Sequence, residues 1–155
     1  MTHEPHYWLT KSEPSDYSID DLERDRSEIW DGVRNYQARN FLRAMQVGDY
    51  AFFYHSNVKP PALVGLMRVV ETEIVDPTQF EPNDKHYDPK ATPEKPRWFT
   101  VRFEFVEKFP QPLTLDRLKA RFTPDELLVV KQGNRLSVMP VETLIAVQLL
   151  AEIRG

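Results

Sequence analysis

The sequence predicts an α+β fold, in which a curved mixed β-sheet or a small β-barrel is flanked by helices. Segments with the apolar spacing of helices and segments with the alternation of strands occur along the chain without a regular strand–helix–strand order, which favours this class over a parallel α/β fold. The length of 155 residues, of which 41% are hydrophobic and 28% charged, is that of one globular domain spanning residues 1–155.

The first third of the chain predicts a strand and two helices. An aromatic and apolar strand is expected at residues 6–10, before Pro14 removes a donor of the strand ladder. Ser18 then stands where an N-cap begins a short helix with acidic residues in its first turn. Apolar residues at helical spacing over residues 35–46 predict a second helix, which Gly48 ends.

Two strands and a long loop are expected in the middle of the chain. Residues 49–56 alternate and predict a strand with one set of side chains on each face. Residues 62–75 form a long β-branched run, in which Gly65 marks a bulge or a close backbone approach. Residues 76–97 contain five prolines and no clear period, which indicates an extended loop.

The last third predicts strands and two further helices. Residues 98–109 alternate most clearly, and Thr100 is expected on their solvent side. A short amphipathic helix is expected at residues 115–122, and a final strand at residues 135–138. Pro140 is expected to open the last helix. The apolar stripe of that helix is predicted to consist of Val141, Leu144, Ile145, Leu149 and Ile153.

Composition excludes several classes of site. Without cysteine, the chain has no disulfide, no thiolate catalysis and no zinc site with sulfur ligands. Its histidines, His3, His6, His55 and His86, show no helical pairing with a carboxylate, so we expect neither a metal nor another cofactor. The formal net charge of -4 argues against a protein that coats nucleic acid by bulk electrostatics.

The chain shows no signal for a membrane or for secretion. No run of 18 apolar residues is present, and the first six residues have neither a basic region nor an apolar signal core. We therefore expect a soluble, intracellular protein of the cytoplasm.

The stretch from Trp30 to Tyr54 combines an aromatic residue, a glycine turn, an arginine-rich helix start and an alternating strand. Core packing alone hardly explains so many polar and aromatic groups in a compact pattern, so we interpret the stretch as one wall of a ligand pocket. A Trp ahead of a Gly is also a common core anchor, and the residues alone leave both roles open for Trp30.

The sequence resembles the EVE domain family in three motifs: YWLTKSEP at residues 7–14, WDGVRNYQARN at residues 30–40 and FYHSN at residues 53–57. Further matches are residues 65–67, 76–80, 86–89, Trp98 and 135–138. The order and spacing match over nearly the whole chain. The resemblance implies a PUA-like fold, related to YTH domains. It also implies a nucleic-acid reader, of DNA or RNA, that accepts a modified base, for example a methylated base or a modified cytosine, in a pocket.

A base lifted from its stack needs a flat aromatic surface and fixed hydrogen-bonding groups. By resemblance to the YTH aromatic cage, Trp30 and Trp98 are expected to supply the surface. Ser12 and Asn35 are expected to read the base edge, with capping and turn chemistry as their alternative role. The predicted base-binding residues are Ser12, Glu13, Trp30, Asp31, Val33, Asn35, Tyr54, Ser56, Asn57, Asp88, Trp98 and Ser137.

Basic side chains near the pocket are candidates for phosphate binding. The predicted residues are Lys11, Arg34, Arg39 and Arg135. For Arg39 and Arg43, a solvated helix face paired with acidic residues is the alternative.

These expectations favour a non-catalytic reader over two alternatives. One is an enzyme that acts on a nucleoside or nucleotide in the same pocket, and the other is a module that binds a protein or a metabolite. A triad of Ser12, His55 and Asp88 is geometrically conceivable, but the sequence has no nucleophile elbow. His55 and Ser56, as neighbours on a strand, face opposite sides and cannot form a nucleophile–base pair.

Overall fold

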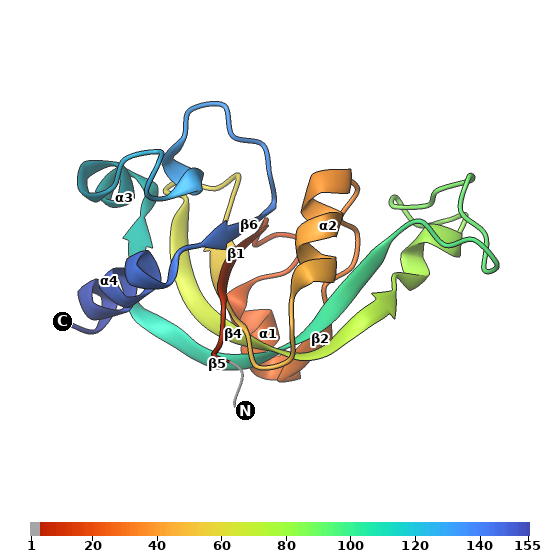
Figure 1. Cartoon of the computed structure of the whole chain (residues 1–155), viewed down its shortest axis with the longest axis horizontal. Helices are drawn as coiled ribbons and strands as arrows, with labels where there is room; N and C mark the ends of the chain where they lie inside the picture. The colour runs from red at the N-terminus through yellow and green to blue at the C-terminus, as the bar shows by residue number, and fades with distance from the viewer. Residues whose placement is uncertain (1–3) are drawn as a thin grey trace.

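Six strands form one mixed, curved sheet in the computed structural model, which describes residues 4–155 (Figure 1). The strands are β1 (Tyr7–Ser12), β2 (Ser27–Ile29), β3 (Tyr50–His55), β4 (Ala62–Val75), β5 (Phe99–Thr114) and β6 (Val138–Val141). Their order in the sheet is β2-β5-β4-β3-β1-β6. The neighbours β1 and β3 are parallel, and the other pairs are antiparallel. The predicted α+β class is confirmed, with an open sheet.

Four helices cover the two faces of this sheet (Figure 1). They are α1 (Ile19–Asp25), α2 (Tyr36–Ala44), α3 (Leu115–Arg121) and α4 (Thr143–Arg154), and two 3₁₀ turns are η1 (Pro77–Phe80) and η2 (Leu128–Val130). The alternation of β3 divides the core between the faces. Phe52 and Tyr54 join the apolar residues of α3 and α4, whereas Ala51 and Phe53 join those of α1 and α2. Both sides of β3 are therefore buried.

Local chemistry sets the helix starts that the sequence predicts. At α1, the Ser18 hydroxyl accepts from the Asp21 amide at 3.1 Å and the Asp21 carboxylate accepts from the Ser18 amide at 2.9 Å, which closes a capping box.

Gly65 in β4 confirms the predicted close approach, because a Cβ there would stand 2.4 Å from Cδ1 of Ile19. Glycine at this position therefore lets α1 pack directly on the sheet.

The C-terminal part differs from the prediction. Pro140 does not open a helix but lies within β6, opposite Trp8 of β1. Since β6 is an edge strand, it tolerates a residue without an N–H group. The last helix starts at Thr143, and Leu144, expected in its buried stripe, is 75% exposed.

Two further differences concern β5. No sequence pattern predicts β2, a strand of three residues that pairs with β5. Thr100 is 2% exposed rather than on a solvent face.

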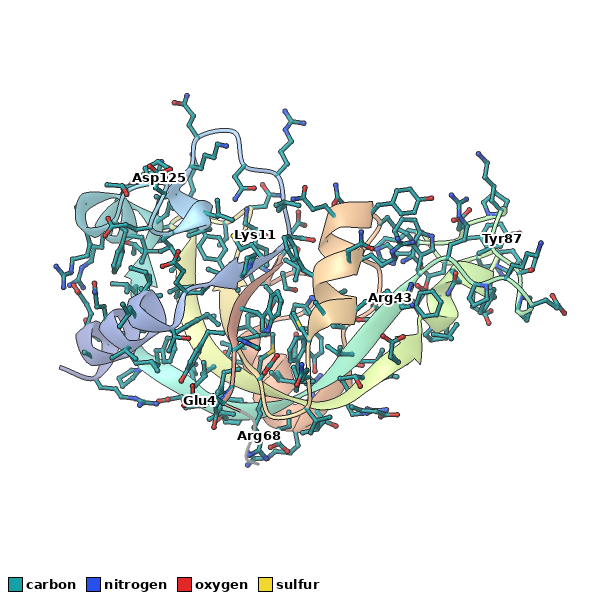
Figure 2. The ribbon with its side chains drawn as sticks, viewed as in Figure 1. Glu4, Lys11, Arg43, Arg68, Tyr87 and Asp125 are labelled. Carbon is teal, nitrogen blue, oxygen red and sulfur yellow. The ribbon has the colours of Figure 1, made fainter. Side chains whose placement is uncertain are left out.

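The loop between β4 and β5 begins at η1 and extends away from the sheet (Figure 1). Figure 2 shows Tyr87 on this loop and Asp125 at the opposite end of the molecule. The loop matters for the site because Lys85 and His86 line the pocket described next.

Candidate functional site

A pocket of about 680 Å³ opens where β1 and β3 end. These strands are parallel neighbours, and Ser12 lies opposite His55 in their register, so the chain leaves both strands at the same place. The segment after β2, the loop after η1 and the segment before β6 supply the other walls. The volume is within the range of ~300–1,000 Å³ that is typical of small-molecule sites.

Trp30 is part of the apolar wall and is 7% exposed. Its indole stands perpendicular to the rings of Phe53 and Phe103, at centroid distances of 5.3 and 5.5 Å. Its amide donates to the Val101 carbonyl at 3.0 Å, and its carbonyl accepts a hydrogen bond from the Thr100 hydroxyl. Trp30 is therefore both a core residue and part of the pocket wall. The burial of Thr100 follows from its hydrogen bond to the Trp30 carbonyl, which satisfies the Thr100 hydroxyl inside the protein.

A turn at Gly32 continues this wall. Gly32 has a φ of 83°, and its amide donates to Asp76 Oδ2 at 2.8 Å. A Cβ on this residue would stand 2.6 Å from Cε1 of His86. His86 Nδ1 in turn lies 3.1 Å from Asp84 Oδ1. Glycine at position 32 therefore lets the His86 ring reach the pocket wall.

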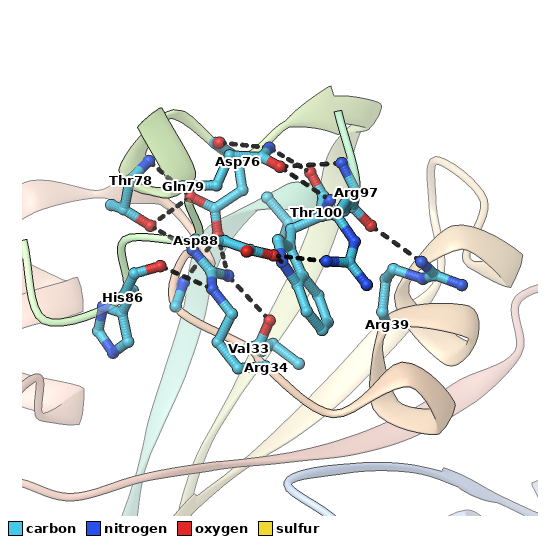
Figure 3. Close-up of polar contacts among 12 residues, drawn as sticks. Val33, Arg34, Arg39, Asp76, Thr78, Gln79, His86, Asp88, Arg97 and Thr100 are labelled. Carbon is cyan, nitrogen blue, oxygen red and sulfur yellow. Dashed lines mark hydrogen bonds and ion pairs between the residues drawn. The ribbon is translucent and has the colours of Figure 1, made fainter. Parts of the chain in front are cut away.

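The Arg34 guanidinium joins the pocket wall to the loop after β4 (Figure 3). It donates to the His86 carbonyl at 2.8 Å, to Asp76 Oδ2 at 3.1 Å and to the Thr78 hydroxyl at 2.9 Å. Its Cζ also lies 5.1 Å from the centroid of Trp98. Because the Asp76 side chain is 2% exposed, the charge of Arg34 is already balanced inside the protein.

Two carboxyl groups in this region have opposite pKa shifts. Burial would raise the pKa of Asp76, but hydrogen bonds from Thr78, Gly32 and Arg34 outweigh it, and the pKa is lowered. Burial raises the pKa of Asp31, and the neighbouring carboxylate of Asp76 raises it further. Asp31 lines the pocket, and a protonated carboxyl can donate as well as accept a hydrogen bond.

Three serines of the pocket offer different hydrogen bonds to a ligand. The Ser12 hydroxyl donates to the Tyr17 carbonyl at 2.6 Å, so it presents acceptor capacity only. The hydroxyls of Ser56 and Ser137 have no hydrogen-bond partner among residues 4–155, so they can donate or accept.

Lys11 and Arg135 are pocket cations that form no ion pair with the rest of the described chain. Burial lowers the pKa of Lys11, whose Nζ lies 5.9 Å from the centroid of Tyr54. Lys85 differs, because its Nζ lies 3.3 Å from Asp16 Oδ1 and joins two segments of the lining. The pocket therefore has two positive charges that form no ion pair within residues 4–155.

The structure brings many predicted residues together in this pocket. Those that line it are Lys11, Ser12, Glu13, Trp30, Asp31, Val33, Arg34, Ser56, Arg135 and Ser137. Those that lie outside its lining are Asn35, Arg39, Tyr54, Asn57, Asp88 and Trp98.

The side chains of Asn35 and Asn57 form hydrogen bonds within the protein. Asn35 is the N-cap of α2, where its Oδ1 accepts from the Ala38 amide at 2.9 Å. Asn57 donates to Glu13 Oε1 at 3.1 Å. The alternative role of capping and turn formation therefore applies to Asn35.

Trp98 and Asp88 form a cluster beside the pocket. Trp98 Nε1 donates to Asp88 Oδ2 at 2.8 Å, and the Trp98 ring stacks on Tyr36. Arg39 donates to the Arg97 carbonyl at 2.9 Å in the same cluster. Tyr54 is 3% exposed in the core next to α3 and α4. None of these four predicted residues lines the pocket.

Sequence reasoning missed part of the lining, namely Asp16, Tyr17, Glu28, Ile29, Gly32, Lys85 and His86. Glu28 and Ile29 belong to β2, which is too short to show alternation. His86 stands in a segment that resembles the EVE domain family, and that resemblance was the available signal.

The side chains of Ser12, His55 and Asp88 do not form a triad. His55 Nε2 accepts from the Ile19 amide at 3.1 Å, while Ser12 is bonded to the Tyr17 carbonyl. Asp88 is engaged by the Trp98 indole, and its hydrogen bond lowers the pKa of that carboxyl.

Neither a metal cluster nor a membrane-spanning helix is found in the described part of the chain. Within residues 4–155, no three His, Cys, Asp or Glu side chains are grouped to hold a metal ion. No helix there has the length and apolar character needed to cross a bilayer. His3 lies outside the described residues.

Close relatives share both sequence and structure with this chain. Thymocyte nuclear protein 1 of Rattus norvegicus is 44% identical over 153 aligned residues, a match that covers 87% of this chain and 68% of that protein. The crystal structure of a protein from Pseudomonas putida has a TM-score of 0.91 and 47% identity, and covers 96% of this chain and 99% of its own. The crystal structure of human THYN1 in complex with DNA containing 5-methylcytosine has a TM-score of 0.88 and 39% identity, with coverages of 97% and 98%.

The predicted relation to YTH domains is confirmed for the fold. The YTH domain of Zygosaccharomyces rouxii MRB1 protein, in complex with N6-methyladenosine RNA, has a TM-score of 0.52 at 13% identity and covers 99% of this chain and 91% of its own. A model of the EVE domain matches residues 6–151. Given this match over nearly the whole chain, together with the close relatives, the chain belongs to the EVE domain family.

Proposed function

We propose that this chain is a non-catalytic reader that binds a modified base of nucleic acid in the pocket beside Trp30. One observation carries the proposal: a single pocket of about 680 Å³ combines an apolar wall, of Ile29, Trp30 and Val33, with hydrogen-bonding groups at the strand ends. A base outside its stack needs both. The complex of human THYN1 with DNA containing 5-methylcytosine supports a methylated base as the ligand.

The polar groups suit a base that carries an amino group. Ser12 accepts from that amino group, because its own proton is held by the Tyr17 carbonyl. Asp31, whose pKa is raised, accepts from the amino group and in its protonated form donates to the adjacent ring nitrogen. Cytosine and adenine present such a donor next to an acceptor.

Phosphate binding falls to Lys11 and Arg135 in this proposal. Their charges have no carboxylate partner in the described chain, whereas Arg34 is paired with buried Asp76. A few local contacts of this kind are compatible with the overall net charge of -4.

The enzyme alternative has less support. Ser12, His55 and Asp88 each have a separate hydrogen-bond partner, so His55 is not in place to act as a base on Ser12. The cellular location stays a prediction: the sequence indicates the cytoplasm, while the relatives carry the word nuclear in their name.

Binding of matched oligonucleotides tests the proposal. We would titrate fluorescent DNA that carries 5-methylcytosine, N6-methyladenine or neither against the wild type and Trp30→Ala. The variant should lose base stacking of about 1–3 kcal/mol. Because Trp30 also supports the core, Ser137→Gln, which fills the pocket from a loop, gives a second measurement. Tyr87→Ala removes an exposed ring outside the lining and serves as the control. Equal binding of all three DNAs by the wild type would reject the proposal.

A further inference from the structure

The ring of Tyr36 offers a second aromatic surface next to the pocket. Tyr36 begins α2, lies two positions after the pocket residue Arg34, and is 46% exposed. One face of its ring stacks on Trp98, with centroids 4.9 Å apart and an interplanar angle of 16°. Trp98 is 6% exposed, so a buried ring supports Tyr36 from behind.

Two guanidinium groups flank the Tyr36 ring. The Arg39 Cζ lies 4.8 Å from the centroid of Tyr36 and 5.9 Å from that of Trp98, so it contacts both rings of the stacked pair. The Arg97 Cζ lies 5.6 Å from the same ring, and Arg97 donates a hydrogen bond to the Tyr36 hydroxyl. Tyr36 is nevertheless 46% exposed, so part of its ring is accessible next to these two cations. We call Tyr36, Trp98, Arg39 and Arg97 the Tyr36 platform.

The charge of Arg39 is not balanced by any carboxylate of the described chain. Its hydrogen bonds go to the Arg97 carbonyl and to Asn40 Oδ1, both uncharged groups. Arg97 differs, since its Nη1 lies 3.5 Å from Asp88 Oδ2. The first turn of α2 has no acidic residue. A partly exposed aromatic ring thus lies beside a positive charge without a carboxylate partner in residues 4–155.

We infer that the Tyr36 platform binds the nucleotide next to the base in the pocket: the neighbouring base stacks on Tyr36, and its phosphate contacts Arg39. Two residues of chain span at most ~7 Å, so the platform lies within reach of a nucleotide whose neighbour is in the pocket. Stacking on a protein ring requires an unpaired base. The ligand is therefore single-stranded, or opened, beside the modified base. This inference rests on the proposed function.

Three ligands separate the platform from the pocket. The first is free 5-methyl-2′-deoxycytidine, the second is a single-stranded DNA pentanucleotide with a central 5-methylcytosine, and the third is the same DNA with abasic sites on both sides of that base. Tyr36→Ala should weaken binding of the intact pentanucleotide about 5- to 150-fold and leave the other two ligands unchanged. Tyr36→Phe should retain the affinity, and Tyr87→Ala, which removes another exposed ring, should have no effect.

Unchanged binding of the intact pentanucleotide by Tyr36→Ala would overturn the inference, as would an equal loss for all three ligands. Thermal melting of each variant shows whether the support from Trp98 has been disturbed. The proposed function fails on a different comparison, that of methylated with unmethylated pentanucleotide in the wild type and Trp30→Ala. The two failures are therefore distinguishable.

Discussion

Gly32 faces the imidazole of His86 so closely that a Cβ on residue 32 would stand 2.6 Å from Cε1 and 2.8 Å from Nε2. The contact holds together the turn after β2 and the loop after η1, which both line the pocket. The shape of the pocket therefore depends on the absence of one carbon atom.

Substitution of Gly32 by alanine should cost more than backbone strain. A non-glycine residue at positive φ costs about 1–2 kcal/mol, and the methyl group must also displace His86. Gly133→Ala is the matched control, because Gly133 has a φ of 78° and a Cβ there would meet nothing within 4 Å. Urea denaturation should show a larger loss for Gly32→Ala, and His86→Ala in that background should restore part of it. Equal losses for the two glycine variants would contradict the steric argument.

Asp76→Asn should destabilise the protein at neutral pH, by about 3 kcal/mol, because it leaves the Arg34 guanidinium without its buried partner. The lowered pKa of Asp76 sets the sign of the pH effect. A carboxyl group whose pKa is lowered by folding stabilises the folded state at pH values above its pKa in the unfolded chain, about 3.9. This stabilisation is lost as the pH falls through the pKa of the folded state. The difference between wild type and variant should therefore shrink in acid, as measured by denaturation midpoints over a pH series.

Asp31→Asn should show the opposite pH dependence. The pKa of Asp31 is raised, so its contribution is fully present below the unfolded pKa and is lost as the pH rises through the folded pKa. The variant should therefore be more stable than the wild type at neutral pH and equal to it in acid. The same denaturation series checks this, and a stability loss at neutral pH would refute it.

Lys11→Ala and Arg135→Ala should each reduce the salt dependence of oligonucleotide binding. Removal of one phosphate contact lowers the slope of log K against log salt by about 0.7 for a single strand. Lys119→Ala on α3 is the control, since Lys119 is an exposed cation outside the pocket lining. Affinities measured over a salt series would contradict the assignment if all three slopes were equal to that of the wild type.

Much of the fold follows from local chemistry. The N-cap at Ser18 and the long strand of residues 62–75 depend on residues close by in the sequence, so the sequence predicts both. The glycine itself marks a close approach at Gly65, but the side chain that comes close belongs to Ile19, which is distant in the sequence. The prediction for Pro140 is wrong because a proline is compatible both with a helix start and with an edge strand, and only the neighbouring strand β1 distinguishes the two.

The site was predictable where strand ends and motifs mark it, as at Ser12, Trp30 and Ser56. It was not predictable where a distant partner decides the role of a side chain. From the sequence, Arg34 is a candidate phosphate ligand, but in the structure it forms an ion pair with Asp76, which is 42 positions away. From the sequence, Asn35 is a candidate for hydrogen bonds to a base edge, but in the structure its side-chain oxygen accepts the hydrogen bond that caps α2.

The long-range contacts of the pocket wall also determine at what stage of protein synthesis the pocket can form. Trp30 bonds to Thr100 over 70 positions, and Gly32 bonds to Asp76 over 44. Chains leave the ribosome N-terminus first, so Ser12, Trp30 and Asp31 emerge long before β5 does. A nascent chain that stops before β5 therefore carries most of the residues that line the pocket but lacks the Thr100 contact to Trp30, and the complete pocket forms only when the second half of the chain has been made.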